Sequence, residues 1–397
     1  MSENLLLTIQ YIAGMEAAVW YGKGDVRVEE VPTPEINDFE CLVAVKYCGL
    51  CKTDIKKIRG QSLSTKGNLE PPRVFGHEIV GEISQLGKYV DCWQEGDRVA
   101  IYHHVPCNNC YYCDNLQFSH CKTYKTVDTS SSLGKPSGGG FAEFVKIPKL
   151  VVEKGMVKIP DNVDYETAVF MEPTNCCLKG IDKAEISIGD TVAVIGQGPI
   201  GLTLDQLATF SGARVIGVDL TDYRLRKAAS SFGANYVVNA AKEDSVKKIK
   251  EIANGRGVDT SIVAVEEPAA VIQALKYARP GGTIVFFSEF GSEYSLIEEK
   301  CLGQKIVNGI YGKELRVIGS YSSSYLRHLD AADLVFSGRI NTKDQISHVT
   351  GLDKLEEMVG IATKRRANPW SDIVENVDKE YSDPPPEERS FKILIKP

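Results

Sequence analysis

The sequence predicts an α/β protein with two domains, a β-rich one and one built on a doubly wound parallel sheet. From Glu16 to about Pro160 the apolar runs are short, β-branched and interrupted by Gly and Pro, which is typical of strands. After about Asp161, strand-like runs alternate with helical patterns, and this alternation indicates a parallel sheet with helices on both faces. A chain of 397 residues is long enough to bury both cores.

The apolar runs also place individual elements. Strands are expected at 41–45, 78–83, 191–195, 214–218, 260–265 and 283–287. Beyond residue 320 we expect two amphipathic helices and a last strand, at 326–336, 352–362 and 391–395. The polar stretch 363–390 contains three consecutive prolines and predicts a partly irregular surface insertion.

The composition excludes several classes of function. A net charge of −7 offers no basic stripe for nucleic acid. The apolar piece at 5–9 is too short to span a bilayer, so we expect an extra N-terminal segment and no membrane partner. Eleven cysteines, clustered at metal-like spacings in a long chain, indicate a reducing compartment, and we expect a cytoplasmic protein.

The strongest motif is a Cys-x2-Cys-x2-Cys-x7-Cys run. Its members are Cys107, Cys110, Cys113 and Cys121. Four thiolates at this spacing predict a closed tetrahedral zinc site, which is structural because no position remains open for water or substrate. A zinc module that binds nucleic acid is an alternative, since Tyr111, Tyr112, Phe118 and Lys122 lie nearby, but the negative net charge argues against it.

A second motif predicts a dinucleotide site. The strand 191–195 runs into Gly196-Gln197-Gly198-Pro199-Ile200-Gly201, and a helical pattern follows. In a G-x-G-x-x-G turn the glycines permit a tight turn and close approach to a pyrophosphate, which meets the helix N-terminus. Asp219, at the end of the next strand, would accept from ribose hydroxyls and repel a 2′-phosphate, so NAD is favoured over NADP. Arg224 could cover the adenine or meet a phosphate, or be a solvated helix charge.

Three scattered fragments supply a second set of metal-ligand types. They contain Cys51, the pair His77 and Glu78, and Glu172. Zinc accepts such mixed ligands when one coordination position must stay open for a reacting group. Singly, a buried Cys, a core His or a helix-start Glu would be an equally good interpretation. Their occurrence beside a dinucleotide motif favours a catalytic metal site.

These motifs together resemble a known family. Gly76-His77-Glu78-x2-Gly81-x5-Gly87-x2-Val90 is similar to the zinc signature of the medium-chain dehydrogenase superfamily, and the four-cysteine run matches its lobe zinc site. Glu172-Pro173 and the segment 313–321 resemble the branch of the polyol (sorbitol) and threonine dehydrogenases. The similarity extends from about Glu16 to Gly360 and resumes at the last strand.

The resemblance implies a GroES-like β-barrel catalytic domain made from both ends of the chain and a Rossmann domain inserted between them. We therefore expect the catalytic domain at 1–163, with a zinc lobe at about 103–124, the Rossmann domain at 164–320 and the rest of the catalytic domain at 321–397. Two zinc ions per chain, NAD and a homodimer or homotetramer are also implied.

The resemblance implies a catalytic zinc on Cys51 and His77, with Glu78 or Glu172 as the third ligand. Cys176 and Cys177 are possible substitutes. Thr53 matches a relay hydroxyl, and Asp54 a carboxylate that orients the histidine ligand. Lys56 stands where many relatives have a relay histidine, and no role is assigned to it. His103, His104, His120, His328 and His348 are interpreted as polar packing.

The predicted reaction is hydride transfer between an alcohol and NAD. Zinc acidifies the hydroxyl as a Lewis acid, and the nicotinamide accepts the hydride. The leading substrates are secondary alcohols in polyols, cyclitols, amino alcohols or sugar derivatives. A primary alcohol or formaldehyde-type dehydrogenase is an alternative, and so is a family member that binds cofactor without catalysis.

Overall fold

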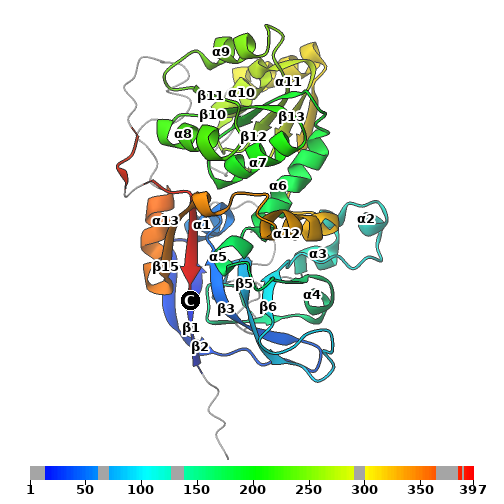
Figure 1. Ribbon diagram of the computed structural model, residues 1–397, viewed down its shortest axis with the longest axis vertical. Coiled ribbons are helices and arrows are strands. Elements are labelled where there is room, and N and C mark those ends of the chain that lie inside the picture. Colours follow the sequence, from blue (N-terminus) through cyan, green and yellow to red (C-terminus); the bar gives the residue numbers. More distant parts are fainter. Residues whose placement is uncertain (1–13, 61–70, 127–137, 290–299, 364–382, 387–388) are drawn as a thin grey trace, which may run out of the picture.

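The structure is a computed structural model that describes residues 14–60, 71–126, 138–289, 300–363, 383–386 and 389–397. The predicted N-terminal extension and most of the predicted insertion at 363–390 lie outside the described residues. Figure 1 shows a β-rich half and an α/β half, with one helix, α6 (Met171–Ala184), running between them.

The β-rich half holds two sheets. A three-stranded sheet has the order β2-β1-β4, and a larger one has the order β15-β16-β3-β5-β6-β8, with β7 paired to β3. The strands are β1 (Gly14–Gly22), β2 (Asp25–Pro32), β3 (Cys41–Gly49), β4 (Arg73–Val74), β5 (Glu78–Leu86), β6 (Arg98–Ile101), β7 (Phe144–Ile147), β8 (Met156–Lys158), β15 (Ile346–Gly351) and β16 (Lys392–Lys396).

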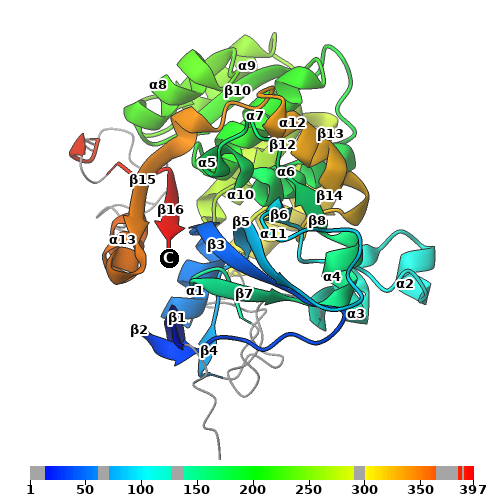
Figure 2. The ribbon, with the colours of Figure 1, turned by 60° about the horizontal axis from the view of Figure 1, so that its bottom comes forward.

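Strands from both ends of the chain share the larger sheet. β16 lies between β15 and β3, and it pairs antiparallel with β3 through Leu394 opposite Gly49. Figure 2 shows β15, β16 and β3 side by side. Three of the five side chains of β16 are buried apolar residues, because both faces of this strand are covered. The terminal strand therefore closes the part of the sheet from which the candidate site is built.

The α/β half is a six-stranded parallel sheet with the order β11-β10-β9-β12-β13-β14. All five residues of the central strand β9 are buried, as expected for a strand covered on both faces. Its strands are β9 (Thr191–Ile195), β10 (Arg214–Asp219), β11 (Tyr236–Asn239), β12 (Val258–Val263), β13 (Ala278–Phe286) and β14 (Arg316–Gly319). The predicted α/β class, with its doubly wound parallel sheet, is confirmed.

The helices fall into two groups, those of the α/β half and those of the rest of the chain. In the α/β half they are α7 (Pro199–Phe210), α8 (Asp222–Ser231), α9 (Ser245–Ile252), α10 (Pro268–Tyr277) and α11 (Lys300–Lys313). The others are α1 (Lys52–Arg59), α2 (Tyr111–Asp114), α3 (Lys122–Thr126), α4 (Lys149–Lys154), α5 (Tyr165–Ala168), α12 (His328–Phe336) and α13 (Leu355–Thr363). The described residues contain no helix long and apolar enough to cross a membrane.

One hydrophobic cluster runs through both halves. It includes Val43 of β3, Cys177 of α6 and Leu202 of α7, all fully buried. α6 packs against α7 and α12, so it connects the β-rich core to one face of the parallel sheet. α6 therefore forms an apolar connection between the two halves.

Replacing Leu394 with Ala should destabilise the β-rich half by about 2–5 kcal/mol, because a fully buried leucine leaves a cavity when it is truncated. Thermal and urea unfolding would measure the loss. The matched control is Lys396→Ala on the same strand, whose side chain is exposed. Equal stability of the two variants would contradict the packing role of β16.

Candidate active site and metal sites

The four cysteines of the sequence motif converge in a small lobe that projects from the side of the molecule (Figure 1). Their sulfur atoms lie within 4.8 Å of one another. The Sγ–Sγ distances are 3.5 Å for Cys110–Cys113, 3.6 Å for Cys107–Cys121 and 3.9 Å for Cys107–Cys113. A tetrahedron with zinc–sulfur bonds of about 2.3 Å has edges of about 3.8 Å. The donor set therefore fits a tetrahedral zinc ion.

Backbone N–H groups in the lobe donate to cysteine sulfur atoms and so stabilise the deprotonated thiolate form. The N–H of Cys107 donates to Cys121 Sγ at 3.4 Å, and the N–H of Asn109 donates to Cys107 Sγ at 3.4 Å. Burial raises the pKa of Cys121, but the N–H groups of Cys107 and Tyr124 outweigh it and lower that pKa to about 6. Burial and the neighbouring Cys110 raise the pKa of Cys113 to about 12. A metal ion would supply the charge needed to deprotonate this last thiol.

The lobe is anchored to the body of the protein through Tyr124. Its hydroxyl donates to the carbonyl of Ser323 at 2.9 Å, and its ring stacks on His104 at 4.7 Å. Tyr124 is 1% exposed and belongs to the same small cluster as Cys113 and Cys121. His104 lies three residues after the end of β6 and is grouped with His103 and Glu172, so Tyr124 ties the lobe to that part of the candidate active site.

A second ligand group forms where β3 ends and β5 begins. Ligand atoms of Cys51, His77 and Glu78 lie within 4.8 Å of one another. Cys51 is the residue that caps α1, while Glu78 pairs with Gly49 in the β3–β5 ladder. The sheet register thus brings two distant chain segments together. Of the four residues predicted for the catalytic zinc, the structure groups these three.

Asp54 positions both segments. Its Oδ2 accepts from the backbone N–H of Cys51 at 3.1 Å, and its Oδ1 lies 3.1 Å from Nδ1 of His77. Asp54 is fully buried; burial raises its pKa, but His77 outweighs that effect and holds the pKa below its usual value. A carboxylate on Nδ1 directs Nε2 of His77 toward the ligand group. This is the arrangement expected for Asp54 from the resemblance.

Glu78 forms an ion pair with a lysine of the last strand, β16. It is 1% exposed and forms an ion pair with Lys392 of β16, which is 4% exposed. Burial lowers the pKa of Lys392, but Glu78 outweighs it and raises that pKa above its usual value. The sequence did not predict that Lys392 would contribute to this site, because its partner Glu78 lies far away in the chain.

Glu172 falls in a separate group with two histidines. Its carboxylate and ring nitrogens of His103 and His104 lie within 4.8 Å of one another. Burial raises the pKa of Glu172, and Cys176 donates to its Oε1 at 3.4 Å. Cys177 instead donates to the carbonyl of Ile200, away from both groups. The sequence interpretation of the two histidines as polar packing did not anticipate this grouping, since neither has any periodic relation to residue 172.

The glycine-rich turn has the predicted form. Gly196 adopts φ 98°, and a Cβ there would lie 2.2 Å from Val265. A Cβ on Gly201 would lie 1.8 Å from the carbonyl oxygen of Gly196, so the helix can approach the strand only without a side chain. Gly198 caps α7, and Pro199 and Ile200 begin it. α7 therefore begins just after the carboxyl end of β9, and a helix N-terminus is a place where N–H groups can bind an anion.

The carboxylate of Asp219 accepts several hydrogen bonds from the protein, which the sequence did not predict. Its Oδ1 accepts from the N–H groups of Leu220 and Thr221 and from Thr221 Oγ1, at 2.7–3.0 Å. Its Oδ2 accepts from the N–H of Gln197 at 2.8 Å and lies 3.8 Å from Arg224 Nη1. The carboxylate therefore ties the end of β10 to the glycine-rich turn.

Lys56 connects the β-rich half to the α/β half. From α1 its ammonium reaches Glu266, just after β12, at 2.9 Å, and Glu289, just after β13, at 3.6 Å. The side chain of Lys56 is 6% exposed. These contacts place α1, which begins beside Cys51, against the carboxyl ends of the parallel strands. Ligands of open α/β sheets bind at those ends. Lys56, to which the sequence assigned no role, thus ties the helix that begins beside Cys51 to the segments that follow β12 and β13.

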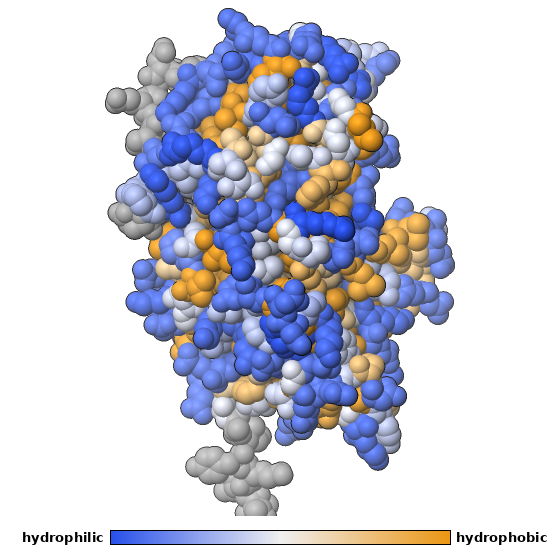
Figure 3. Space-filling view, in the orientation of Figure 1, coloured by the Kyte–Doolittle hydropathy of each residue, from blue (hydrophilic) through white to orange (hydrophobic). Residues whose placement is uncertain are grey.

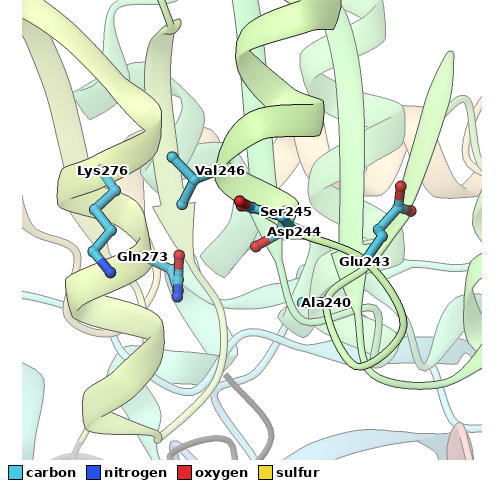
Figure 4. A pocket seen from close by; sticks show the side chains of 7 residues that line it. All are labelled: Ala240, Glu243, Asp244, Ser245, Val246, Gln273 and Lys276. Carbon is cyan, nitrogen blue, oxygen red and sulfur yellow. The ribbon is translucent and has the colours of Figure 1, made fainter. Parts of the chain in front are cut away.

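A separate cavity of about 360 Å³ lies between α9 and α10. Figure 4 shows the polar side chains that line it, among them Ser245, Gln273 and Lys276. None of the predicted site residues lines this cavity.

Comparisons with known proteins identify the family of the chain. Residues 37–161 match the alcohol dehydrogenase GroES-like domain, and residues 199–337 match the zinc-binding dehydrogenase domain. The chain is 29% identical to a sorbitol dehydrogenase of Bacillus subtilis, over 86% of this chain and 92% of the relative. It is 32% identical to an L-threonine 3-dehydrogenase of Bacillus licheniformis, over 85% and 92%.

A solved structure extends the likeness to the whole fold. A putative zinc-binding dehydrogenase from Sinorhizobium meliloti, bound to NADP, superposes with a TM-score of 0.76 at 28% identity, over 97% of this chain and all of that one. Both halves of the chain, the GroES-like barrel and the Rossmann sheet, are thus accounted for by one family. The chain belongs to the zinc-containing medium-chain alcohol dehydrogenases, oxidoreductases of CH–OH groups, near the sorbitol and threonine dehydrogenase branch.

Proposed function

We propose that this protein is a zinc- and NAD-dependent dehydrogenase that oxidises a secondary alcohol of a polyol, cyclitol, amino alcohol or sugar derivative. The observation that carries the proposal is the group formed by Cys51, His77 and Glu78, whose ligand atoms lie within 4.8 Å of one another. The contacts of Lys56, on the helix that begins beside Cys51, with Glu266 after β12 and Glu289 after β13 support a placement of this group near the carboxyl ends of those strands. A mixed thiolate, imidazole and carboxylate set suits a zinc ion with an open position.

The proposed roles of the two metal sites differ. The four-cysteine lobe would hold a structural zinc ion, since all four ligands are protein thiolates. Cys51 and His77 would hold the catalytic ion, with Glu78 as the third ligand favoured by proximity over Glu172. Lys392 would regulate the availability of the Glu78 carboxylate, because an ion pair and a metal compete for the same oxygen atoms.

The metal, the nicotinamide and two side chains near Cys51 would each have a separate role in the proposed reaction. Zinc would supply Lewis acidity to the substrate hydroxyl, and the nicotinamide would accept the hydride. Asp54 keeps Nε2 of His77 directed to the ligand group through its contact with Nδ1. Thr53, exposed in the first turn of α1, would take the hydroxyl proton as the first relay group.

NAD is the proposed cofactor, with NADP less favoured. Gly196, Gly198, Pro199, Ile200 and Gly201 would receive the pyrophosphate at the start of α7. Asp219 would repel a 2′-phosphate at the rim of the crevice. Arg224, 3.8 Å from Asp219, offsets part of that repulsion.

A homodimer or homotetramer is proposed as the assembly. β14 is an edge strand of the parallel sheet, and Val317 on it is 38% exposed. Figure 3 shows apolar side chains on the projecting zinc lobe, where Leu116 is 68% exposed. An unpaired edge and an exposed apolar lobe are both surfaces that a second copy would cover. The unpaired thiols of both ligand groups support the cytoplasm as the compartment.

The substrate class is tested with a panel of polyols, inositols, threonine and simple primary alcohols, with NAD as acceptor and NADH formation as the measurement. We expect kcat/KM to be highest for a secondary alcohol that carries neighbouring oxygen or nitrogen groups. Turnover confined to small primary alcohols would refute the proposed substrate class and favour the formaldehyde-type alternative.

The two zinc roles are separated by Cys51→Ser and Cys110→Ser. Each should remove one zinc ion per chain, measured by elemental analysis after desalting. Cys51→Ser should lower the rate of hydride transfer about 10³-fold or more, because it removes a metal ligand. The melting temperature of this variant should stay nearly unchanged. Cys110→Ser should lower the melting temperature first, because the lobe depends on its metal. A folded Cys110→Ser protein that keeps both zinc ions but loses hydride transfer would reverse the assignment.

Cofactor choice is tested with Asp219→Ser. A like-charge repulsion of about 1–4 kcal/mol would disappear, so the ratio of kcat/KM for NADP to that for NAD should rise about tenfold. The control is Asp222→Asn in the first turn of α8, whose carboxylate is engaged by Lys242 and Asn239. An unchanged ratio in a stably folded Asp219→Ser protein would show that the carboxylate does not select the cofactor.

A further inference from the structure

An acid is buried in the middle of α7, the helix that follows the glycine-rich turn. Asp205 interrupts the apolar residues of this helix and is 0% exposed. Neither of its carboxyl oxygens has a hydrogen-bond partner among the described residues. A buried polar atom without a partner is costly, and a buried unpaired charge is more so. The proposed metal and substrate sites do not account for this residue, so its place in the fold calls for another explanation.

The neighbour of this acid is the side chain of Gln197, in the glycine-rich turn. Gly201 lies one helical turn before Asp205, and a Cβ on Gly201 would lie 3.7 Å from Nε2 of Gln197, so Asp205 and Gln197 share one side of α7. Among the described residues, Gln197 is the side chain that acts on the pKa of Asp205. Gln197 is itself 0% exposed, and its Oε1 also has no partner there. Three unpartnered oxygen atoms are thus buried side by side.

Gln197 connects the glycine-rich turn to the parallel sheet. Its Nε2 donates to the carbonyl of Val194 in β9 at 3.0 Å, and its backbone N–H donates to Asp219 at the end of β10 at 2.8 Å. Its carboxamide fills the space beside Gly217 of β10, where a Cβ would lie 3.1–3.3 Å from it. Because Nε2 donates to Val194, the orientation of the amide is fixed, and Oε1 points to a different partner.

No charged group forms an ion pair with Asp205 in the part of the chain that the structure describes. α7 packs mainly against α6, β9 and β10, and it has no other titratable side chain itself. β9 has no titratable side chain, those of β10 are Arg214 and Asp219, and those of α6 are Glu172, Cys176, Cys177, Lys179, Asp182 and Lys183. None of them acts on the pKa of Asp205, which burial raises well above its usual value and Gln197 lowers only in part. A carboxylate ion here would therefore be unpaired.

We propose that Asp205 is a neutral carboxylic acid that positions the glycine-rich turn through Gln197, an inference that rests on the proposed role of this turn in dinucleotide binding. A neutral carboxyl group donates through its O–H and accepts through its other oxygen, whereas a carboxylate can only accept. The O–H of Asp205 donates to Oε1 of Gln197, and the other oxygen accepts the second hydrogen of Nε2. One proton satisfies all three unpartnered atoms. Asp205 is a positioning residue, because it acts on the cofactor through Gln197.

Asp205→Asn tests the protonation state, because an amide pairs with Gln197 in the same way and cannot ionise. In the unfolded chain Asp205 loses its proton at about pH 4, whereas in the folded chain it keeps the proton to a higher pH. The wild-type protein should therefore lose stability relative to Asp205→Asn as the pH rises, by about tenfold in the folding equilibrium constant per pH unit between about pH 5 and 7. Urea unfolding followed by circular dichroism measures this difference.

The control is Asp333→Asn on α12, whose side chain is 65% exposed. Its stability relative to the wild type should not change with pH over the same range. A constant difference between wild type and Asp205→Asn would show that Asp205 is ionised in the folded protein, and would overturn the proposal.

Asp205→Leu separates a positioning role from a purely structural one. Leucine has the same branched shape and no charge, but it leaves Oε1 of Gln197 without a donor. We expect this variant to resist urea at pH 8 at least as well as the wild type, and yet to raise the Kd for NADH about tenfold. Asp205→Asn should keep the wild-type Kd. The fluorescence of bound NADH measures both constants, and the smaller Asp205→Val serves if the leucine variant does not fold.

A double-mutant cycle shows whether the effect passes through Gln197. In a Gln197→Met background, Asp205→Leu should not change the Kd for NADH further, because the acceptor is already gone. Equal NADH binding by folded Asp205→Asn and Asp205→Leu proteins would refute the positioning role and leave the proposed function intact. A wild-type chain that binds neither NADH nor NADPH would refute the proposed function and the positioning role together, while a pH-dependent stability difference would still show that Asp205 is neutral.

Discussion

The candidate site depends on one buried carboxylate in one sheet register. Asp54 binds the backbone of Cys51 with one oxygen and faces His77 with the other, so a single side chain fixes two ligands from separate chain segments. Those segments meet because Gly49 pairs with Glu78 between β3 and β5. A shift of this pairing by one residue would turn Glu78 to the opposite face of the sheet and break the ligand group. The barrel therefore positions the candidate metal ligands.

The remaining parts of the site come from three other junctions of the fold. The terminal strand β16 brings Lys392 to Glu78, the start of α6 brings Glu172, and the segment after β6 brings His103 and His104. The first two of these junctions join segments that lie far apart in sequence. A shared hydrophobic cluster that runs through α6 packs the two halves together around them.

The parts that the sequence could predict are those encoded by local spacing. The four-cysteine run, the glycine-rich turn and the alternation of strands and helices all depend on residues close together in the chain. The contact of Lys56 with Glu266, the ion pair of Lys392 and the grouping of Glu172 with two histidines depend on sheet order and domain packing, which periodicity does not report. Asp219 shows the limit within a motif, because its position was predictable while its engagement by backbone donors was not.

The ion pair between Lys56 and Glu266 bears on how the two halves of the protein could move apart. At the carboxyl ends of β12 and β13, where ligands of open α/β sheets bind, a nearly buried ammonium already bridges the two halves. Bulk salt screens such a buried pair only weakly. Any movement that parted the two halves would have to separate these charges first, so the strength of this one ion pair bears on how readily a ligand could enter between them.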